Sequence, residues 1–266
     1  MGEFMTPQSM LLYSRLLATF RNGWRLIQTI RGGPPIDVAI LWDGTRISHP
    51  PRRRGLVEII VELWLEQPYT KDGFYWPKDG DVIVDAGANV GVFSIWLSRQ
   101  CSKARIISLE PFAENYVYFE SNLRAAGVGP DRVMPSQVAL GKDFGQGQMT
   151  SVGDRSLDHT LSSDGVDDPG GLSVPIVPLA GLFDLAKADR INLLKVDIEG
   201  SEKDAFESVD PETLRRCDRI AIEYHDNIRP GTLALLHERL RGTHDFVTKP
   251  SSVEGCGILL AKLKQP

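Results

Sequence analysis

The chain of 266 residues contains few cysteines, and the three present, Cys101, Cys217 and Cys256, lie far apart. An odd number at this spacing suits neither a disulfide framework nor a metal site, so we expect a reducing, cytoplasmic location. The sequence also lacks an excess of positive charge, because 35 acidic residues outnumber 30 basic ones. A broad basic face that would bind nucleic acid is therefore not expected.

Long hydrophobic runs are absent as well. No apolar run reaches the roughly 18 residues of a membrane-spanning helix, so we predict no membrane span. Arg15, Arg21 and Arg25 interrupt the early apolar residues, which argues against a secretory signal. Residues 1–4 resemble a remnant of an expression vector ahead of Met5. Hydrophobic residues make up 42% of the chain, which is typical of a soluble globular protein.

Residues 1–76 read as an N-terminal cap of helices and a hairpin rather than a separate domain. Apolar residues at helical spacing over residues 7–31 predict a helix, which Gly and Pro residues then stop. The Asp43-Gly44 pair indicates a hairpin turn, and residues 55–67 predict a short amphipathic helix. The N-terminal helix could pair two subunits in a homodimer.

Residues 77–266 alternate between strand-like and helix-like segments, which predicts an α/β domain with a mostly parallel, doubly wound sheet. A closing pair of strands suggests one antiparallel edge strand. Residues 141–175 interrupt this order as an irregular segment rich in Gly, Ser and Asp, in which a weak hairpin is the one regular element considered. The expected strands are residues 81–85, 105–110, 132–140, 191–197, 218–225, 245–250 and 255–263.

The turn after the first of these strands has the composition of a ligand site. Residues 82–93 read VIVDAGANVGVF, in which Asp85 ends a strand and Gly87, Asn89 and Gly91 precede a helix. In a doubly wound sheet, ligands bind beyond the carboxyl ends of the strands, and a Gly-rich turn lets them approach the main chain. A tight turn without any ligand is the plainer interpretation.

A second acidic residue favours a ligand that carries a ribose. Glu110 ends the next strand, about where dinucleotide-binding folds place a carboxylate that accepts hydrogen bonds from both ribose hydroxyls. A dinucleotide cofactor would favour the spacing G-x-G-x-x-G, whereas here Asp85 leads the turn. This acid would repel a pyrophosphate but suits a cation such as the sulfonium of S-adenosylmethionine. The charge of Asp85 therefore favours a methyl donor.

Four motifs, in order, are similar to the FkbM-type family of S-adenosylmethionine-dependent methyltransferases. The resemblance covers roughly residues 69–260, and its most distinctive segment is LLKVDIEGSE; the motifs are DVIVDAGANVGVFS, SLEPFAENYVYFESNL, LLKVDIEGSEKDAF and AIEYHD. It implies the class I methyltransferase fold, a Rossmann-like doubly wound sheet, and transfer of a methyl group to hydroxyls of sugars, polyketides or other secondary metabolites. We expect the donor to contact a set of eight residues: Asp85, Gly87, Asn89, Gly91, Glu110, Pro111, Phe112 and Val138.

Methyl transfer to an alcohol needs a base to remove the hydroxyl proton. Asp197 ends the strand at 191–197, Glu199 comes two residues later, and Glu223 and His225 end the strand at 218–225 on one face. The class I fold that the resemblance implies makes these two strands neighbours, so we expect the four groups to cluster beside the donor methyl group. His225 is the first candidate for the general base, because its ordinary pKa lies near neutrality. Asp197 or Glu199 would orient it, bind the acceptor hydroxyl or act as the base. The plainer alternatives are a structural histidine and a carboxylate at a helix N-terminus.

Glu202 and Lys203 are expected on a solvated helix surface, and other assignments stay open. A divalent metal on these residues is compatible with the sequence, but no ligand spacing demands it and none is predicted. Lys195, in an otherwise apolar strand, should pair with a carboxylate such as Asp85 or Glu223. A nicotinamide-dependent oxidoreductase and a non-catalytic donor-binding protein remain the alternatives to a methyltransferase. The small-molecule acceptor itself cannot be read from the sequence.

Overall fold

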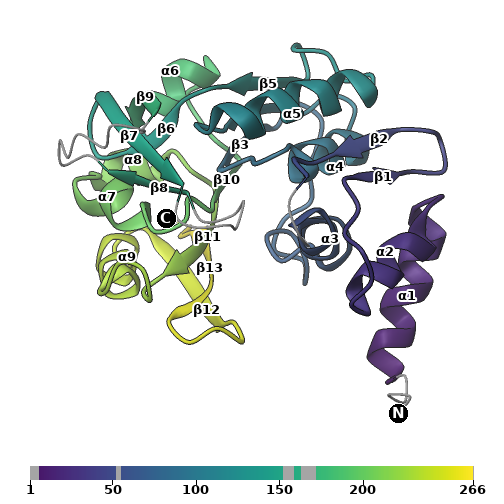
Figure 1. Ribbon diagram of the computed structural model, residues 1–266. Coiled ribbons are helices and arrows are strands. Elements are labelled where there is room, and N and C mark those ends of the chain that lie inside the picture. Colours follow the sequence, from purple (N-terminus) through teal and green to yellow (C-terminus); the bar gives the residue numbers. More distant parts are fainter. Residues whose placement is uncertain (1–5, 52–54, 152–158, 163–171, 266) are drawn as a thin grey trace.

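The computed structural model describes residues 6–51, 55–151, 159–162 and 172–265, so the expected vector remnant at residues 1–4 lies outside it. Its centre is a seven-stranded sheet in the order β12-β13-β11-β10-β3-β4-β5 (Figure 1). The strands are β3 (Val82–Ala86), β4 (Arg105–Leu109), β5 (Val133–Ser136), β10 (Leu193–Val196), β11 (Arg219–His225), β12 (His244–Pro250) and β13 (Cys256–Leu263).

The sheet is mostly parallel, as predicted. β3 pairs in parallel with both β4 and β10, and β10 pairs in parallel with β11. At one edge β13 runs antiparallel to both β11 and β12, which gives the predicted antiparallel edge. The strand order reverses between β3 and β10, and this reversal is where doubly wound folds bind their ligands.

Helices cover both faces of this sheet (Figure 1). One apolar core packs α4 (Val92–Gln100) and α5 (Ala113–Ala125) against the sheet together with the N-terminal cap. The opposite core contains α6 (Gly181–Ala186), α7 (Glu202–Glu207), α8 (Pro211–Arg215) and α9 (Thr232–Leu240). None of the described helices has the length and apolar character to cross a membrane.

The cap shares its core with the sheet rather than forming one of its own. Leu16, Phe20 and Leu26 belong to the same buried cluster as Ile83 of β3 and Phe93 of α4. The cap elements are α1 (Pro7–Thr19), α2 (Gly23–Ile30), β1 (Val38–Ile40), β2 (Arg46–Ser48), α3 (Gly55–Ile59) and η1 (Ile60–Glu66). The hairpin expected around Asp43-Gly44 is the β1–β2 pair.

Two helix predictions in the cap need correction. The segment 7–31 forms two helices because the chain turns after Phe20, which bridges to Leu41, and Gly23 then packs against the Leu16 carbonyl. The segment 55–67 continues from α3 into the π-helix η1, which ends where Gln67 adopts a left-handed φ of 54°. Apolar spacing predicts a helix here, but it does not reveal the wider π-helical turn.

The single strand predicted over residues 132–140 also needs correction. The strand predicted over 132–140 is divided between β5 in the main sheet and β6 (Ala139–Gly141) in a second sheet. In its described part, the segment 141–175, predicted to be irregular with a weak hairpin at most, contributes to the other three strands of this second sheet, and two of them form an antiparallel pair. That four-stranded sheet has the order β6-β9-β7-β8, with β7 (Gly145–Ser151), β8 (His159–Ser162) and β9 (Leu172–Pro178).

Candidate active site

A cavity of about 350 Å³ opens at the carboxyl ends of β3, β10 and β11. The parallel pairing predicted for 191–197 and 218–225 is present, since Val196 lies opposite Ile222. β10 also pairs with β3, so the turns that follow all three strands meet at the reversal of strand order. The cavity is therefore at the place where this topology favours a ligand.

The turn after β3 is held in a conformation that few side chains allow. Gly87, Asn89 and Gly91 have positive φ angles of 78°, 51° and 83°. A Cβ atom on Gly91 would overlap the Phe119 ring, and one on Gly87 would overlap the carbonyl oxygen of Asp197. Glycine is thus required at both positions by the packing of the protein itself, in addition to any close approach of a ligand.

Glu110 fastens this turn to the end of β4. One carboxylate oxygen, Oε2, accepts a hydrogen bond of 2.8 Å from the Asn89 amide, and Oε1 accepts one of 2.8 Å from the Phe112 amide. Burial raises the pKa of Glu110 to about 7, although these amides favour the ionised form. Each oxygen has a second lone pair, so the carboxylate can still accept hydrogen bonds from a ligand.

The structure places half of the eight predicted donor residues on the cavity wall. Gly87, Asn89, Glu110 and Pro111 line the cavity. The other four are not among its lining residues: Asp85, Gly91, Phe112 and Val138. Ala139 and Leu140, which directly follow Val138, line the wall instead. The last two residues of the strand expected over 132–140 therefore form this part of the wall.

Asn115 is a lining residue that the sequence analysis missed. It lies on α5, is only 3% exposed, and its Oδ1 atom has no hydrogen-bond partner among the described residues. A buried amide oxygen normally has a partner, so a ligand with hydrogen-bond donors would fit here. An adenosyl compound carries such donors on its ribose and adenine.

Asp85 does not face the cavity, and the argument from its charge must be revised. It is fully buried, and Ser94 Oγ donates a hydrogen bond of 2.6 Å to its Oδ2. Lys195 Nζ lies 3.2 Å from its Oδ1, on the adjacent position of β10. This ammonium compensates the charge that was expected to select a cationic donor. The partner predicted for Lys195 is thus present, but it makes Asp85 part of the scaffold.

Lys195 also holds the turn after β3, residues 87–91, which we call the donor turn after the ligand expected there. Its ammonium donates a 2.7 Å hydrogen bond to the Gly87 carbonyl and lies 3.4 Å from Asp197 Oδ2. Burial alone would lower the pKa of Lys195, but Asp85 and Asp197 raise it above its ordinary value. The side chain is therefore a fixed cation that connects β3 and β10.

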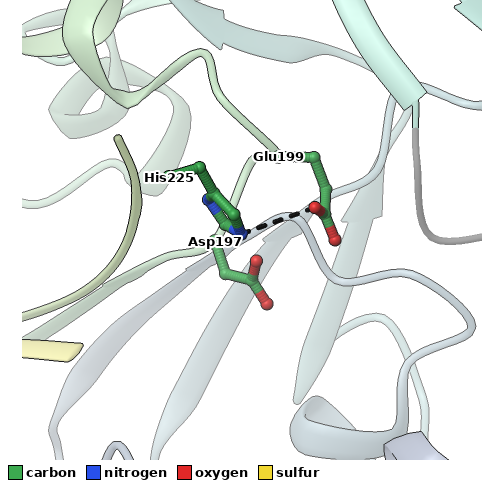
Figure 2. Close-up of side chains that lie close together, drawn as sticks. All are labelled: Asp197, Glu199 and His225. Carbon is green, nitrogen blue, oxygen red and sulfur yellow. Dashed lines mark ion pairs between the residues drawn. The ribbon is translucent and has the colours of Figure 1, made fainter. Parts of the chain in front are cut away.

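The three predicted catalytic residues come together at the end of β10 and β11 (Figure 2). His225 Nε2 lies 3.5 Å from Glu199 Oε2, and the side chain of Asp197 lies beside this pair (Figure 2). Glu199 reaches this position through a left-handed φ of 52°, just before Gly200 at 97°. A strained turn therefore directs the Glu199 carboxyl back toward the strand that carries His225.

Glu202 is the second partner of His225, and the sequence analysis wrongly expected it on a solvated helix surface. Its side chain is fully buried, and its Oε1 lies 3.0 Å from His225 Nδ1. The same oxygen accepts hydrogen bonds of 3.2 Å from the amides of Ile198 and Gly200. The tight turn after Asp197 folds the first residue of α7 under β11, which residue type and spacing did not reveal.

These carboxylates change the protonation of His225. Burial alone would lower its pKa, but the hydrogen bond and charge of Glu202, with Asp197 and Glu199, raise it to about 10. Burial and the charge of Asp197 raise the pKa of Glu199 to about 9. At neutral pH the imidazole therefore carries a proton, and a protonated imidazole cannot accept another. The site favours a different group as the base.

Glu223 meets that requirement. Burial and the charge of Asp197 raise its pKa to about 7, against the hydrogen bond from Tyr69. The Tyr69 hydroxyl donates to Glu223 Oε2 at 2.7 Å and lies farther, 3.2 Å, from Asp197 Oδ2. Because one hydroxyl has one proton, the shorter contact is the stronger bond. Burial and the two carboxylates raise the pKa of Tyr69 well above 10, so this hydroxyl keeps its proton.

Glu62 is a further lining residue without a clear sequence signal. It projects from the π-helix η1 onto the same cavity wall as Glu223. Burial, followed by the charges of Glu223 and Asp197, raises its pKa to about 8. Glu62 is therefore mostly neutral at pH 7 and can donate a hydrogen bond. π-helical turns occur frequently at functional sites.

The cluster also has the dimensions of a cation site. Asp197, Glu199 and His225 offer one ligand atom each, all within 4.8 Å of one another. A divalent cation would need the neutral imidazole as its ligand, so it would have to displace the proton that Glu202 stabilises on His225.

Comparison with known proteins places these features in a family. The methyltransferase FkbM domain model matches residues 85–244. "Methyltransferase 1" of Beauveria bassiana is 27% identical over 206 residues, which are 70% of this chain and 81% of that protein. "Hexuronic acid methyltransferase AglP" of Haloferax volcanii is 23% identical over 187 residues, covering 66% of this chain and 72% of that protein.

A solved structure supports the fold. The FkbM methyltransferase from Methylobacillus flagellatus superposes with a TM-score of 0.51 at 15% identity, covering 96% of this chain and 59% of that one. The expected class I methyltransferase fold is thereby confirmed, and the family assignment supports S-adenosylmethionine as the methyl donor. Because the domain model matches more than half of the chain, this protein belongs to the FkbM methyltransferase family.

Proposed function

We propose that this methyltransferase transfers the methyl group of S-adenosylmethionine to a hydroxyl oxygen of a neutral small molecule, such as a sugar, glycoside, polyketide or other secondary metabolite. One observation carries the proposal: Glu223, a carboxyl with a pKa of about 7, lies on the cavity wall beside the turn after β3. A base poised near the working pH is what removal of an alcohol proton needs.

The donor would occupy the part of the cavity beside the β3 turn. Gly87 and Asn89 would present main-chain groups to it, Glu110 would accept from its ribose, and Asn115 Oδ1 would accept a further hydrogen bond. S-adenosylmethionine, when bound, supplies a methyl group that is already activated by the positive sulfonium. Asp85 would then act only by fixing the turn from beneath, through Lys195.

The acceptor hydroxyl would lie between Glu223 and His225. Tyr69 fixes Glu223 Oε2 by its hydrogen bond, which leaves Oε1 to take the proton. The protonated His225 would stabilise negative charge on the acceptor oxygen, and the hydrogen bond and charge of Glu202, followed by the charge of Asp197, keep that imidazole charged. Asp197 maintains the raised pKa of Glu223. In this proposal His225 remains catalytic, but as a cation rather than as the general base.

A neutral hydroxyl suits this site better than a carboxylate acceptor. The name of the Haloferax volcanii relative indicates that it acts on a hexuronic acid. In this chain six carboxyl groups line the cavity: Glu58, Glu62, Glu110, Asp197, Glu199 and Glu223. Burial first, and then the charges of neighbouring carboxylates, raise the pKa values of Glu62, Glu199 and Glu223. An acidic acceptor would add a further negative charge at that place.

The experiment is a turnover assay with labelled S-adenosylmethionine and a panel of neutral glycosides and polyketides, with their carboxylic acid counterparts beside them. Methylation of neutral hydroxyl compounds supports the proposal, and methylation confined to the acids contradicts it. A thermal shift separates the alternatives, since S-adenosylhomocysteine rather than NAD should raise the melting temperature. Donor binding without turnover on any member of the panel would favour a non-catalytic donor-binding protein.

The remaining expectations concern partners and location. We propose a cytoplasmic protein that binds no nucleic acid, in line with its acidic balance. The exposed apolar residues Leu11, Leu17 and Trp24 on α1 and α2 support pairing of two subunits through the cap. Light scattering of the purified protein measures that state directly.

A further inference from the structure

A second cavity, of about 570 Å³, lies between the N-terminal cap and the end of the β12–β13 pair. Its volume falls within the roughly 300–1,000 Å³ that small-molecule sites occupy. The walls come from segments far apart in the sequence, and much of their surface is apolar: Leu12, Ile30, Val57, Val61, Pro250 and Ile258. We call this space the cap cavity.

The cap cavity adjoins the candidate active site. Glu58, Glu62, Glu223 and Ser251 line both cavities, so a single molecule can occupy both. Glu223, the proposed base, therefore faces the cap cavity as well as the donor turn. A hydroxyl placed beside Glu223 would have the rest of its molecule directed into this apolar space.

We propose that the cap cavity binds the apolar body of the methyl acceptor, so that the substrates are neutral amphipathic molecules with a hydroxylated head and an uncharged apolar part of about two fused rings. This inference rests on the proposed function, because it specifies the acceptor of the same site. It also assigns a role to the N-terminal cap: α1, α2 and η1 form an acceptor wall that the methyltransferase sheet alone would lack.

The polar groups at the boundary support a neutral occupant. Glu58, Glu62 and Glu66 follow one another at intervals of four along α3 and η1, and all three line the cap cavity. Glu223 adds a fourth carboxyl group, against the two ammonium groups of Lys71 and Lys249, and Lys249 already pairs with Asp72 at 2.8 Å. This balance of charge disfavours an anionic body. Glu62 lies where the two cavities join, and burial with the charge of Glu223 raises its pKa to about 8. Its neutral carboxyl can donate a hydrogen bond to the head of the acceptor.

Two glucosides test the inference, because they share one hydroxylated head and differ in the apolar body. Calorimetry in the presence of S-adenosylhomocysteine should show that 2-naphthyl β-glucoside binds about tenfold or more tightly than methyl β-glucoside. Val61→Trp places an indole in the cap cavity and should remove that advantage. The matched control Val117→Trp adds the same bulk at an exposed position on α5 and should preserve it.

Circular dichroism and the affinity for S-adenosylhomocysteine show whether each variant is folded. If Val61→Trp is not, Ile258→Trp fills the cavity from β13 instead. Equal affinity of the wild-type protein for both glucosides, or no binding of the naphthyl compound, overturns the inference. A folded Val61→Trp or Ile258→Trp variant that still binds the naphthyl glucoside more tightly than the methyl glucoside also overturns the inference. If the naphthyl glucoside binds preferentially but is not methylated, the proposed function is refuted, whereas the inference that the cap cavity binds an apolar group is supported.

Discussion

Lowering the pH from 8 to 5 should reduce kcat/KM for the acceptor about a hundredfold, if Glu223 is the general base. Its pKa of about 7 arises from burial and the charge of Asp197, so roughly 90% of the group is ionised at pH 8 and 1% at pH 5. The rate should therefore fall about tenfold for each pH unit below 7. The same argument gives a plateau between pH 8 and 9.

A second limb should appear at high pH. The pKa of His225 is about 10, so above that value the imidazole becomes neutral and no longer stabilises charge on the acceptor oxygen. The assay measures initial rates of S-adenosylhomocysteine release from pH 5 to 11, with the donor saturating and the acceptor below its KM. The expected profile is a bell with limbs near 7 and 10.

Substitution of Glu223 tests whether this residue causes the limb of the pH profile near 7. Glu223→Gln keeps an acceptor for the Tyr69 hydroxyl but cannot take a proton, so it should lower the rate by about 10²–10⁴-fold and abolish the limb near 7. Glu238→Gln, at an exposed position on α9, is the matched control and should leave the profile unchanged. A rate that continues to rise tenfold per unit from pH 8 to 10 would refute this reasoning and restore His225 as the base.

Four further predictions follow from the same contacts. Glu110→Ala should weaken S-adenosylhomocysteine binding by about tenfold or more in calorimetry, since the carboxylate holds the donor turn; unchanged affinity would contradict that role. Lys195→Met leaves Asp85 buried and uncompensated, so it should cost about 3–5 kcal/mol and lower the melting temperature by ~10 °C. Lys195→Met combined with Asp85→Asn should recover part of the loss. The pKa of Glu62 rises from 4.5 to about 8 on folding, so its stabilising contribution is complete below pH 4.5 and lost as the pH rises to 8. Glu62→Gln should therefore raise the melting temperature by ~2–6 °C at pH 9 and leave it unchanged at pH 4. Removing divalent cations with EDTA should leave turnover within about twofold, because metal ligation requires neutral His225; activity that is lost and then restored by Mg²⁺ would show the opposite.

The sheet could be predicted from the sequence because each of its strands is a local apolar run bounded by a turn signal. The resemblance to a known family then allowed the predicted neighbours 191–197 and 218–225 to be paired, and β10 and β11 do pair. That pairing brought Asp197, Glu199 and His225 together as expected. The donor turn was equally visible, since its glycines are required by local backbone angles.

The protonation states could not be predicted in the same way. The pKa of His225 depends on Glu202, which its place at the start of α7 suggested would be solvated. Asp85 was one of two partners predicted for Lys195, but the sequence did not show that this ammonium would compensate the charge assigned to donor selection. Such values depend on which buried groups become neighbours, and a residue pattern does not contain that information.

The π-helical turn in the N-terminal cap could not be predicted from the sequence for a different reason. Hydrophobic spacing indicated a helix over 55–67, yet Glu62 points into the site from a π-helical turn that this spacing does not encode. The strands within residues 141–175 were also hard to predict. Their Gly- and Ser-rich composition gives a weak strand signal, and these strands pair mainly with one another. Tertiary pairing decided the structure in that segment.

The contact between Gly87 and the Asp197 carbonyl has a consequence for how this enzyme can change. Any larger residue at position 87 would push apart the loops that follow β3 and β10. In the proposed function one loop contacts the donor and the other carries the acid–base groups, so a single methyl group would disturb both halves together. New acceptor preferences can therefore arise more readily in the cap, whose residues are free of that constraint, than at the junction where the two loops touch.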